Sequence, residues 1–253
     1  MGDSSRSGWA FGLYETRFEP GWLPAGFLPD FRWSQPDQDG LTLKRQLPHG
    51  GERIDIQLAP RGGRVLGLRA PRRPSWKPFP SGTALLVWAW APGAPARVEV
   101  WNRKDARDIA ERVAASLRIS VPEPVAYSLA VRQPAGFSVK LAGVHYRPDG
   151  TYTSNVLFGT DDPEKDRDVL LYPTDDPITP NTAVGGRPAR IFTQDHYASV
   201  EVQFAHAVAD VVSHDPDQPA AELRADCLAI AATVRMVGDP TDPTTWRTPP
   251  VYR

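Results

Sequence analysis

The sequence contains one cysteine, Cys227, in 253 residues. A single cysteine excludes a disulfide within the chain, so thiol usage does not reveal the redox compartment. Cys227 lies on the inward stripe of a predicted helix, and we expect it to pack as a small apolar residue. A reactive thiol is the alternative.

Long apolar runs are also missing. The longest run, residues 84–91, is far shorter than the roughly 20 residues that a membrane-spanning helix needs. Residues 1–8 lack the apolar segment of a signal peptide. We therefore expect the chain as given to be soluble. One interpretation is that Met1 and Gly2 mark a chosen boundary after removal of an anchor.

The chain has no excess of positively or negatively charged residues. Lys and Arg number 29 and Asp and Glu number 30, which gives a formal net charge of -1. Bulk charge thus excludes strong binding to polyanions, and no sequence-specific nucleic acid is expected. The sequence also lacks Gly-x-Ser-x-Gly, His-Glu-x-x-His and Gly-x-Gly-x-x-Gly, so we predict neither an enzyme nor a bound cofactor.

Metal-binding spacing is missing as well. Three histidines lie near two aspartates in the second half, but they match no known ligand pattern: His196, His206, His214, Asp195 and Asp215. The acidic run 161–168 lacks the order of a calcium loop. We predict surface histidines at strand ends, a solvated hairpin tip at 161–168, and no metal site.

The chain does contain an internal repeat. Residues 113–119 recur as 230–236, an offset of 117, and residues 23–27 recur as 133–137, an offset of 110. Such repeats define the organisation of a chain, and this one predicts two modules of common domain size. The predicted boundaries are 9–120 for the first module, 121–127 for a Pro-rich linker, 128–238 for the second module and 239–253 for an extended or disordered tail.

Hydrophobic periodicity predicts the elements of each module. The first has strands at 41–47, 54–58, 85–91 and 97–101 and a helix at 105–117, with 85–91 expected to be central because it is almost wholly apolar. The second has strands at 137–141, 152–158, 169–172, 189–192, 199–204 and 207–212 and a helix at 221–234. We therefore predict an α+β fold of two tandem modules, each an antiparallel sheet with a C-terminal helix packed on one face.

The same motifs resemble small bacterial extracytoplasmic modules. In the first copy, 22–27 and 110–119 resemble the domain of unknown function fused to anti-sigma factors, akin to the MucB/RseB lipid-sensing fold. In the second copy, 134–137 and 186–189 with the closing helix also resemble PsbP-like lipoproteins. These families are mostly noncatalytic, so the resemblance implies sensing, binding or scaffolding and transfers no catalytic residue.

The segment 56–98 combines basic and aromatic residues without one Asp or Glu. Arginine beside aromatic residues on a loop binds phosphates, lipid headgroups or acidic protein surfaces. The predicted binding residues are Arg61, Arg64, Arg69, Arg72, Arg73, Trp76 and Lys77. Two alternatives for these arginines stay open. In one they keep a Pro-rich connection soluble, and in the other they contact the acidic run of the second module.

Two tryptophans of the first module, Trp88 and Trp90, are spaced to point to one face of a strand. They could line an apolar ligand cavity under the sheet. Core filling is the favoured alternative, because each indole buries a large area.

Taken together, the repeat and the resemblance predict a noncatalytic, extracytoplasmic or membrane-tethered binding or sensing protein. Its predicted partner is a lipid, an anionic polymer or a protein. The excess of Arg over Lys and the many Ala, Pro and Gly residues indicate a high-GC bacterium such as an actinobacterium. The alternatives are a cytoplasmic interaction or scaffolding protein and an enzyme with a site between the modules.

Overall fold

A computed structural model describes residues 14–15, 18–35, 38–47, 51–59, 75–77, 82–91, 93–119, 123–124, 126–247 and 251–252. The chain divides into two compact units. We call them the N-terminal unit (Tyr14–Glu123) and the C-terminal unit (Pro124–Arg253).

The described part of the chain is mostly β-sheet, with 53% of its residues in strands and 13% in helices. The described residues hold only two α-helices. The predicted two-module α+β fold is therefore wrong. The helical periodicity was strong enough to locate both helices, but several short strands show no clean alternation, and the prediction underestimated the share of sheet.

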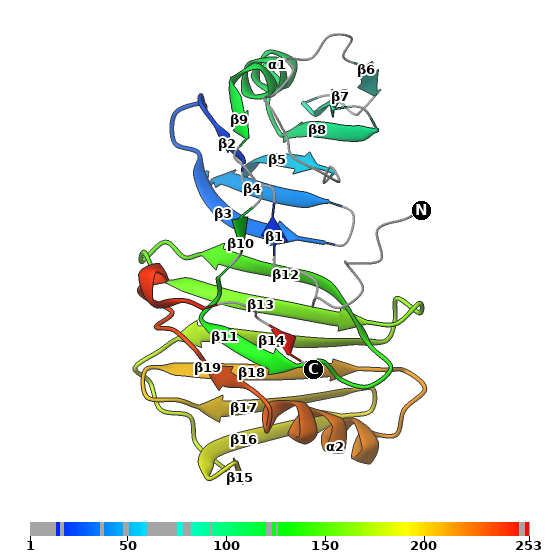
Figure 1. Ribbon diagram of the computed structural model, residues 1–253, viewed down its shortest axis with the longest axis vertical. Coiled ribbons are helices and arrows are strands. Elements are labelled where there is room, and N and C mark those ends of the chain that lie inside the picture. The colour runs from blue at the N-terminus through cyan, green and yellow to red at the C-terminus, as the bar shows by residue number, and fades with distance from the viewer. Residues whose placement is uncertain are drawn as a thin grey trace. The chain divides into compact units, whose positions relative to one another are not determined.

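Six antiparallel strands form the main sheet of the N-terminal unit, in the order β3-β4-β5-β8-β7-β6 (Figure 1). The helix α1 (Ala106–Ser116) packs on β7 and β8. A small pair, β2 (Phe18–Pro20) and β9 (Leu117–Ile119), joins the segments before and after this core. The remaining bounds are β1 (Tyr14–Glu15), β3 (Leu28–Ser34), β4 (Asp39–Arg45), β5 (Glu52–Leu58), β6 (Ser75–Lys77), β7 (Ala84–Ala91), β8 (Ala94–Trp101) and β10 (Glu123–Pro124).

Seven antiparallel strands form the main sheet of the C-terminal unit, in the order β12-β13-β14-β18-β17-β16-β15 (Figure 1). The helix α2 (Ala220–Ala231) packs on β16, β17 and β18. A smaller sheet has the order β19-β11-β20. The remaining bounds are β11 (Leu129–Arg132), β12 (Ser138–Tyr146), β13 (Tyr152–Gly159), β14 (Asp166–Pro173), β15 (Thr182–Val184), β16 (Arg187–Gln194), β17 (Tyr197–Gln203), β18 (Ala207–His214), β19 (Arg235–Met236), a 3-10 turn at Pro243–Thr245 and β20 (Val251–Tyr252).

The two units share one topology. In each unit, the first three strands of the main sheet form a meander. The chain then crosses to the opposite edge of the sheet and forms a second meander, whose last strand pairs with the third strand of the first meander. These seams are β5–β8 and β14–β18. The strand after each helix then pairs with the strand before the sheet, β9 with β2 and β19 with β11. The sequence repeat is thus also a repeat of structure.

The repeat extends to single hydrogen bonds. Gly26 and Gly136 have φ of 83° and 81°, a region that glycine adopts without steric cost, at the turn before the first sheet strand. At the end of the helices, the Ser116 hydroxyl accepts the backbone N–H of Trp22 at 3.1 Å, and the Thr233 hydroxyl accepts that of Arg132 at 3.2 Å. One hydroxyl in each unit therefore ties the end of the helix to the segment that leads into the sheet.

A β-bulge at the same place fixes the correspondence between the two sheets. It lies between Pro29 and Phe31 on β3 and between Val139 and Leu141 on β12, an offset of 110 (139 minus 29). Following the strand pairing from this bulge across both sheets matches β5 with β14 and β8 with β18. Residue-by-residue comparison of the two units follows from this register.

Each unit has its own hydrophobic core beneath its helix. The inward face predicted for 105–117 is confirmed, because its side chains are buried in the core: Ala106, Ile109, Ala110, Val113, Ala114 and Leu117. Cys227 of α2 is also buried, with its Sγ 3.0 Å from the Ser213 hydroxyl, and burial raises the pKa of its thiol to about 11. The prediction of a small buried residue is confirmed there.

The predicted strands are all present, with shifted ends. The expectation that 85–91 is central is wrong, since β7 lies second from the edge of its sheet, beside the three-residue β6. The strand is apolar because one of its faces lies in the core under α1. No helix among the described ranges is both long and apolar enough to span a membrane.

The tail beyond Val237 packs on the C-terminal unit where it is described. Backbone hydrogen bonds of 2.9 and 3.1 Å join Tyr127 and Arg247. Val251 is fully buried, and β20 runs parallel to β11. Within this tail, residues 239–242 form a turn closed by the Asp242 N–H on the Asp239 carbonyl at 3.0 Å, and the 3-10 turn follows it.

Candidate functional site

The arginine part of the predicted binding loop lies outside the described residues: Arg61, Arg64, Arg69, Arg72 and Arg73. Trp76 and Lys77 lie on β6, where Lys77 is exposed. The Arg107 guanidinium of α1 stacks on the Trp76 ring at 4.4 Å, so this tryptophan is held against the helix. Binding by this loop stays a prediction.

Trp88 and Trp90 do share one face of β7, and both are buried, with exposed fractions of 4% and 1%. The Trp90 indole donates to the carbonyl of Ala59 at 3.1 Å. The Trp88 indole N–H is buried and makes no hydrogen bond among the described residues. Their burial in the core beneath α1 fits the core-filling alternative, while an apolar ligand cavity stays a prediction.

The sheet of the C-terminal unit has a second face, which we call the outer face because it lies opposite α2. The alternation of β17 defines it: Ala198, Val200 and Val202 are buried in the core, so the residues between them point outward. Strand pairing then arranges the outer face of β16 and β17 as three opposed pairs, Arg190 with Glu201, Phe192 with Ser199, and Gln194 with Tyr197.

Phe192 is the most unusual residue of this face. It is 53% exposed, and it is one of three exposed large apolar residues among those the structure describes. Its ring meets the half-buried Tyr197 ring edge to face, with centroids 6.2 Å apart. An aromatic pair in the middle of a strand pair presents a rigid apolar surface to solvent, which is a common feature of binding sites.

A pocket of about 450 Å³ opens at this pair. Its lining includes an ion pair: Arg190 donates from Nε to Glu201 at 2.6 Å, so the two charges balance each other. The Asn181 amide brackets the backbone of Ile191, accepting its N–H at 2.9 Å and donating to its carbonyl at 3.0 Å. The pocket thus combines an aromatic wall with a neutral ion pair and a fixed strand edge. Its lining is Asn181, Arg190, Ile191, Phe192, Tyr197, Ser199 and Glu201.

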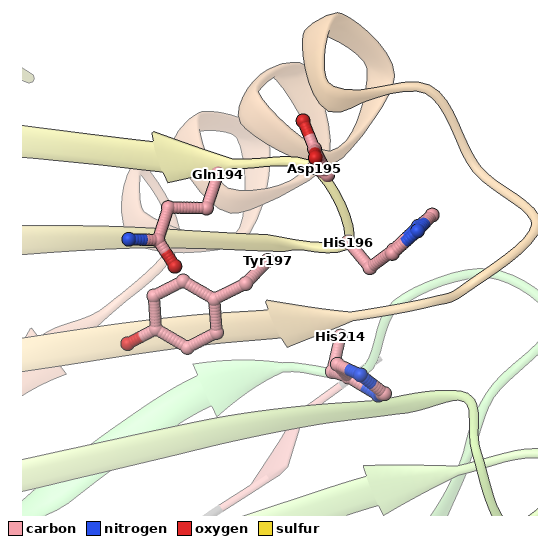
Figure 2. Close-up of a pocket in the computed structure, with 5 residues that line it drawn as sticks. All are labelled: Gln194, Asp195, His196, Tyr197 and His214. Atoms are coloured by element: carbon pink, nitrogen blue, oxygen red, sulfur yellow. The ribbon is translucent and has the colours of Figure 1, made fainter.

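A second pocket of about 410 Å³ lies on the other side of Tyr197, at the β16–β17 hairpin. Figure 2 shows the Gln194 and Tyr197 side chains side by side, while Asp195 points away from them. His196 and His214 complete the lining at the strand ends. A hydrogen bond of 2.8 Å joins His214 Nδ1 to the carbonyl of Glu164, which orients the imidazole. Tyr197 belongs to both pockets and connects them.

Carboxylates on β14 and β18 continue the outer face. Burial raises the pKa of Asp168 to about 6, and the nearby Asp166 adds to the rise, although the Asn155 amide donates to Asp168 and opposes it. Burial likewise raises the pKa of Asp166 and of Asp210, the latter against the lowering effect of a 2.7 Å hydrogen bond from Ser199. These carboxyl groups therefore take up protons at a higher pH than ordinary carboxyl groups.

The structure brings together two of the three histidines that sequence analysis grouped. His196 and His214 line the same pocket, while His206 is exposed and lies 3.8 Å from Asp175. No group of three or more His, Cys, Asp or Glu suited to a metal ion occurs within the described ranges. The run 161–168 is exposed at 161–164, as a hairpin tip should be, but Asp166–Pro173 forms β14.

Comparison with known proteins adds no name to this site. No protein-family model matches the chain, and no curated protein matches it either.

Sequence analysis missed the first pocket, and it considered Asp195, His196 and His214 of the second pocket only as a metal site, which it rejected. The alternation at 199–204 was recognised and could have been extended to Tyr197, which has the outward parity. Phe192 lies opposite Ser199, and that pairing depends on a two-residue turn at Asp195 and His196 that the sequence does not specify.

Proposed function

We propose that the protein is a noncatalytic binding protein, and that it takes its ligand on the outer face of the C-terminal unit at Phe192 and Tyr197. The observation that carries this proposal is the exposed Phe192 ring in a pocket that also holds the Arg190–Glu201 ion pair. Exposed aromatic residues contribute much of the energy of binding sites, and they contribute little to the stability of a sheet.

The polar groups of the site support recognition. Arg190 and Glu201 hold each other, Ser199 donates to Asp210, and the amide of Asn181 is engaged by the backbone. Such fixed groups orient a ligand without large reorganisation. A steady turnover of any substrate by the purified protein, lost in the Tyr197→Phe variant, would contradict the noncatalytic assignment.

The cellular setting belongs to the same proposal. The resemblance of 22–27, 110–119 and 134–137 to extracytoplasmic modules and the Arg-rich composition support a cell-envelope protein of an actinobacterium. Fractionation of the host cells tests this location. Recovery of the intact protein in the cytosolic fraction alone would favour the alternative of a cytoplasmic interaction protein.

The binding proposal is tested by NMR on the full chain, with a fragment library that contains saccharides, lipid headgroups, cations, anions and short peptides. We expect the largest shift changes at Phe192 and Tyr197, and their loss in Phe192→Ala. Leu28→Ala is the matched control, because Leu28 is 68% exposed and lies in the other unit. Shift changes confined to other surfaces, or unchanged by Phe192→Ala, would overturn the proposal.

A further inference from the structure

We infer that the ligand of this site is a neutral oligosaccharide, which rests on the proposed function and specifies its ligand class. The inference combines three features of the outer face: the orientation of the aromatic rings, the charge of the pocket linings, and the continuity of the two pockets through Tyr197.

The aromatic rings provide the first argument. Phe192 is 53% exposed on a strand of the sheet, and Tyr197 holds it from the side at 6.2 Å. The face of an aromatic ring carries negative partial charge, and it attracts the weakly positive C–H groups on one side of a pyranose ring. A ligand with one apolar flat side and a polar rim matches this surface better than a uniformly apolar chain.

The rim of the first pocket is polar and already in place. Glu201 receives Arg190 on its Oε2 atom, and its other carboxylate oxygen has further lone pairs to accept a hydroxyl. The Arg190 guanidinium has five N–H donors, of which the ion pair uses a part. The guanidinium can donate a hydrogen bond to a sugar hydroxyl, and the carboxylate can accept one from it.

The charges of the pocket linings disfavour an anionic ligand. The first pocket holds Arg190 and Glu201, which form an ion pair. The second holds the carboxylate of Asp195 beside His196 and His214, and its lining contains no Lys or Arg. The outer face beyond the pockets carries Asp168 and Asp210, which also disfavour an anionic polymer. Of a neutral and an anionic ligand, the neutral one is therefore the better match.

The two pockets indicate more than one sugar ring. Their volumes of about 450 and 410 Å³ each lie in the range of small-ligand sites, and Tyr197 lines both. An oligosaccharide that stacks on Phe192 would pass Tyr197 and reach Gln194 and the two histidines. Binding should therefore strengthen from a disaccharide to a hexasaccharide.

The test is calorimetric titration of the full chain with neutral hexasaccharides of glucose, mannose, xylose and arabinose. We expect at least one to bind, with affinity about tenfold lower in Phe192→Ala, which corresponds to the loss of about 1.4 kcal/mol of aromatic stacking. Phe192→Trp should keep the affinity, and Leu28→Ala should leave it unchanged. Raising NaCl from about 0.05 to 0.5 M should have little effect, since a neutral ligand has no charge to screen.

Several results would overturn the inference. They are binding of hexalysine or polyphosphate in preference to every neutral sugar, binding of a neutral sugar that Phe192→Ala does not weaken, and no binding by the whole panel. If other fragments still shift Phe192 in the NMR experiment, the saccharide assignment fails and the proposed binding function stands. If no fragment shifts Phe192, the proposed function fails as well.

Discussion

The outer faces of the two units differ although their sheets share one topology. In the N-terminal unit, Trp33 is only 9% exposed, and its ring lies where a side chain at Gly40 would be. In the C-terminal unit, Gly143 pairs with Asn155 at the matching place, and the exposed aromatic residue is Phe192 on another strand. The fold was repeated while its outer side chains diverged, so the two outer faces present different surfaces to a ligand.

The inward faces differ too. The register that starts from the bulge matches Ile54 of β5 with Arg167 of β14, and both are buried, with exposed fractions of 0% and 1%. Arg167 donates to Asp226 and to Gln218 at 2.9 Å each and to the carbonyl of His214. One copy thus places an alkyl side chain where the other places an ion pair with Asp226, in the middle of α2.

The largest expected effect comes from removing that buried cation. Arg167→Ala should lower the free energy of unfolding by about 3 kcal/mol, because it leaves a cavity beside Phe137 and frees the groups that Arg167 joins. Urea denaturation followed by fluorescence measures this. Arg167→Met is the control that keeps volume, and it should cost less than half as much. An equal cost for both variants would show that charge, and not packing, dominates.

The next effect concerns pH. The folded Asp168 keeps its proton up to about pH 6, whereas an unfolded aspartate releases it near pH 4, so the folded state binds more protons between these values. Stability should therefore fall by on the order of 2 kcal/mol as pH rises through this window. The raised pKa values of Asp166 and Asp210 act in the same direction. Asp168→Asn should flatten the profile, measured by urea denaturation from pH 4 to 7.

The other copy offers a sharper variant for this test. Asp55 matches Asp168, and there the neighbour is Arg53, whose Nε lies 2.7 Å from Asp55. In the C-terminal unit, Asp166 occupies the position that matches Arg53, so the neighbour of Asp168 carries a negative charge where the neighbour of Asp55 carries a positive one. Asp166→Arg should lower the pKa of Asp168, as followed by carboxyl-carbon NMR. A pKa that stays near 6 would show that burial alone raises it.

A smaller loss of stability is expected when a glycine of the N-terminal sheet, Gly40, is replaced by alanine. A Cβ on Gly40 would lie 2.1 Å from the Trp33 ring, so Gly40→Ala should cost about 1–2 kcal/mol through displacement of the indole. Gly159→Ala is the matched control, because its Cβ would meet the flexible Lys140 side chain at 2.9 Å. The difference in thermal midpoint between the two variants checks this, and equal midpoints would contradict it.

The smallest effect on stability is expected at the proposed site. Phe192→Ala should change the free energy of unfolding by no more than about 0.5 kcal/mol, since the ring is half exposed. Leu28→Ala, at 68% exposure in the other unit, should behave alike. A large loss of stability for Phe192→Ala alone would assign the ring a structural role and weaken the case for binding.

Periodicity predicted much of the local structure. The stripe 106–117 located α1 because apolar spacing of 3.6 residues is specific to helices, and the alternation at 54–58 located β5. It missed β3, where a bulge shifts the alternation between Pro29 and Phe31, and β11, which has only four residues. The fold class was wrong for the same reason, because missed strands lowered the expected share of sheet.

The candidate site could not be predicted from local patterns in the sequence. Phe192 and Ser199 are adjacent only through strand pairing, and exposure depends on which face α2 covers. The sequence pattern drew attention to Trp88 and Trp90, whose apolar spacing reflects the core. Buried carboxylates such as Asp168 are also invisible in the sequence, since the groups that shift its pKa come from three strands, β13, β14 and β18.

The seams β5–β8 and β14–β18 have a consequence for how the chain folds. Each meander consists of hairpins that form quickly from near neighbours, but a seam joins strands that are distant in the chain and must close a long loop. Closure of the seam should therefore set the folding rate of each unit. The seam also divides each main sheet into two sets of strands. A chain cut within 174–181, between β14 and β15, would place the two sets of the C-terminal unit on separate fragments. Reassembly of these fragments would report on proximity in a split-protein assay.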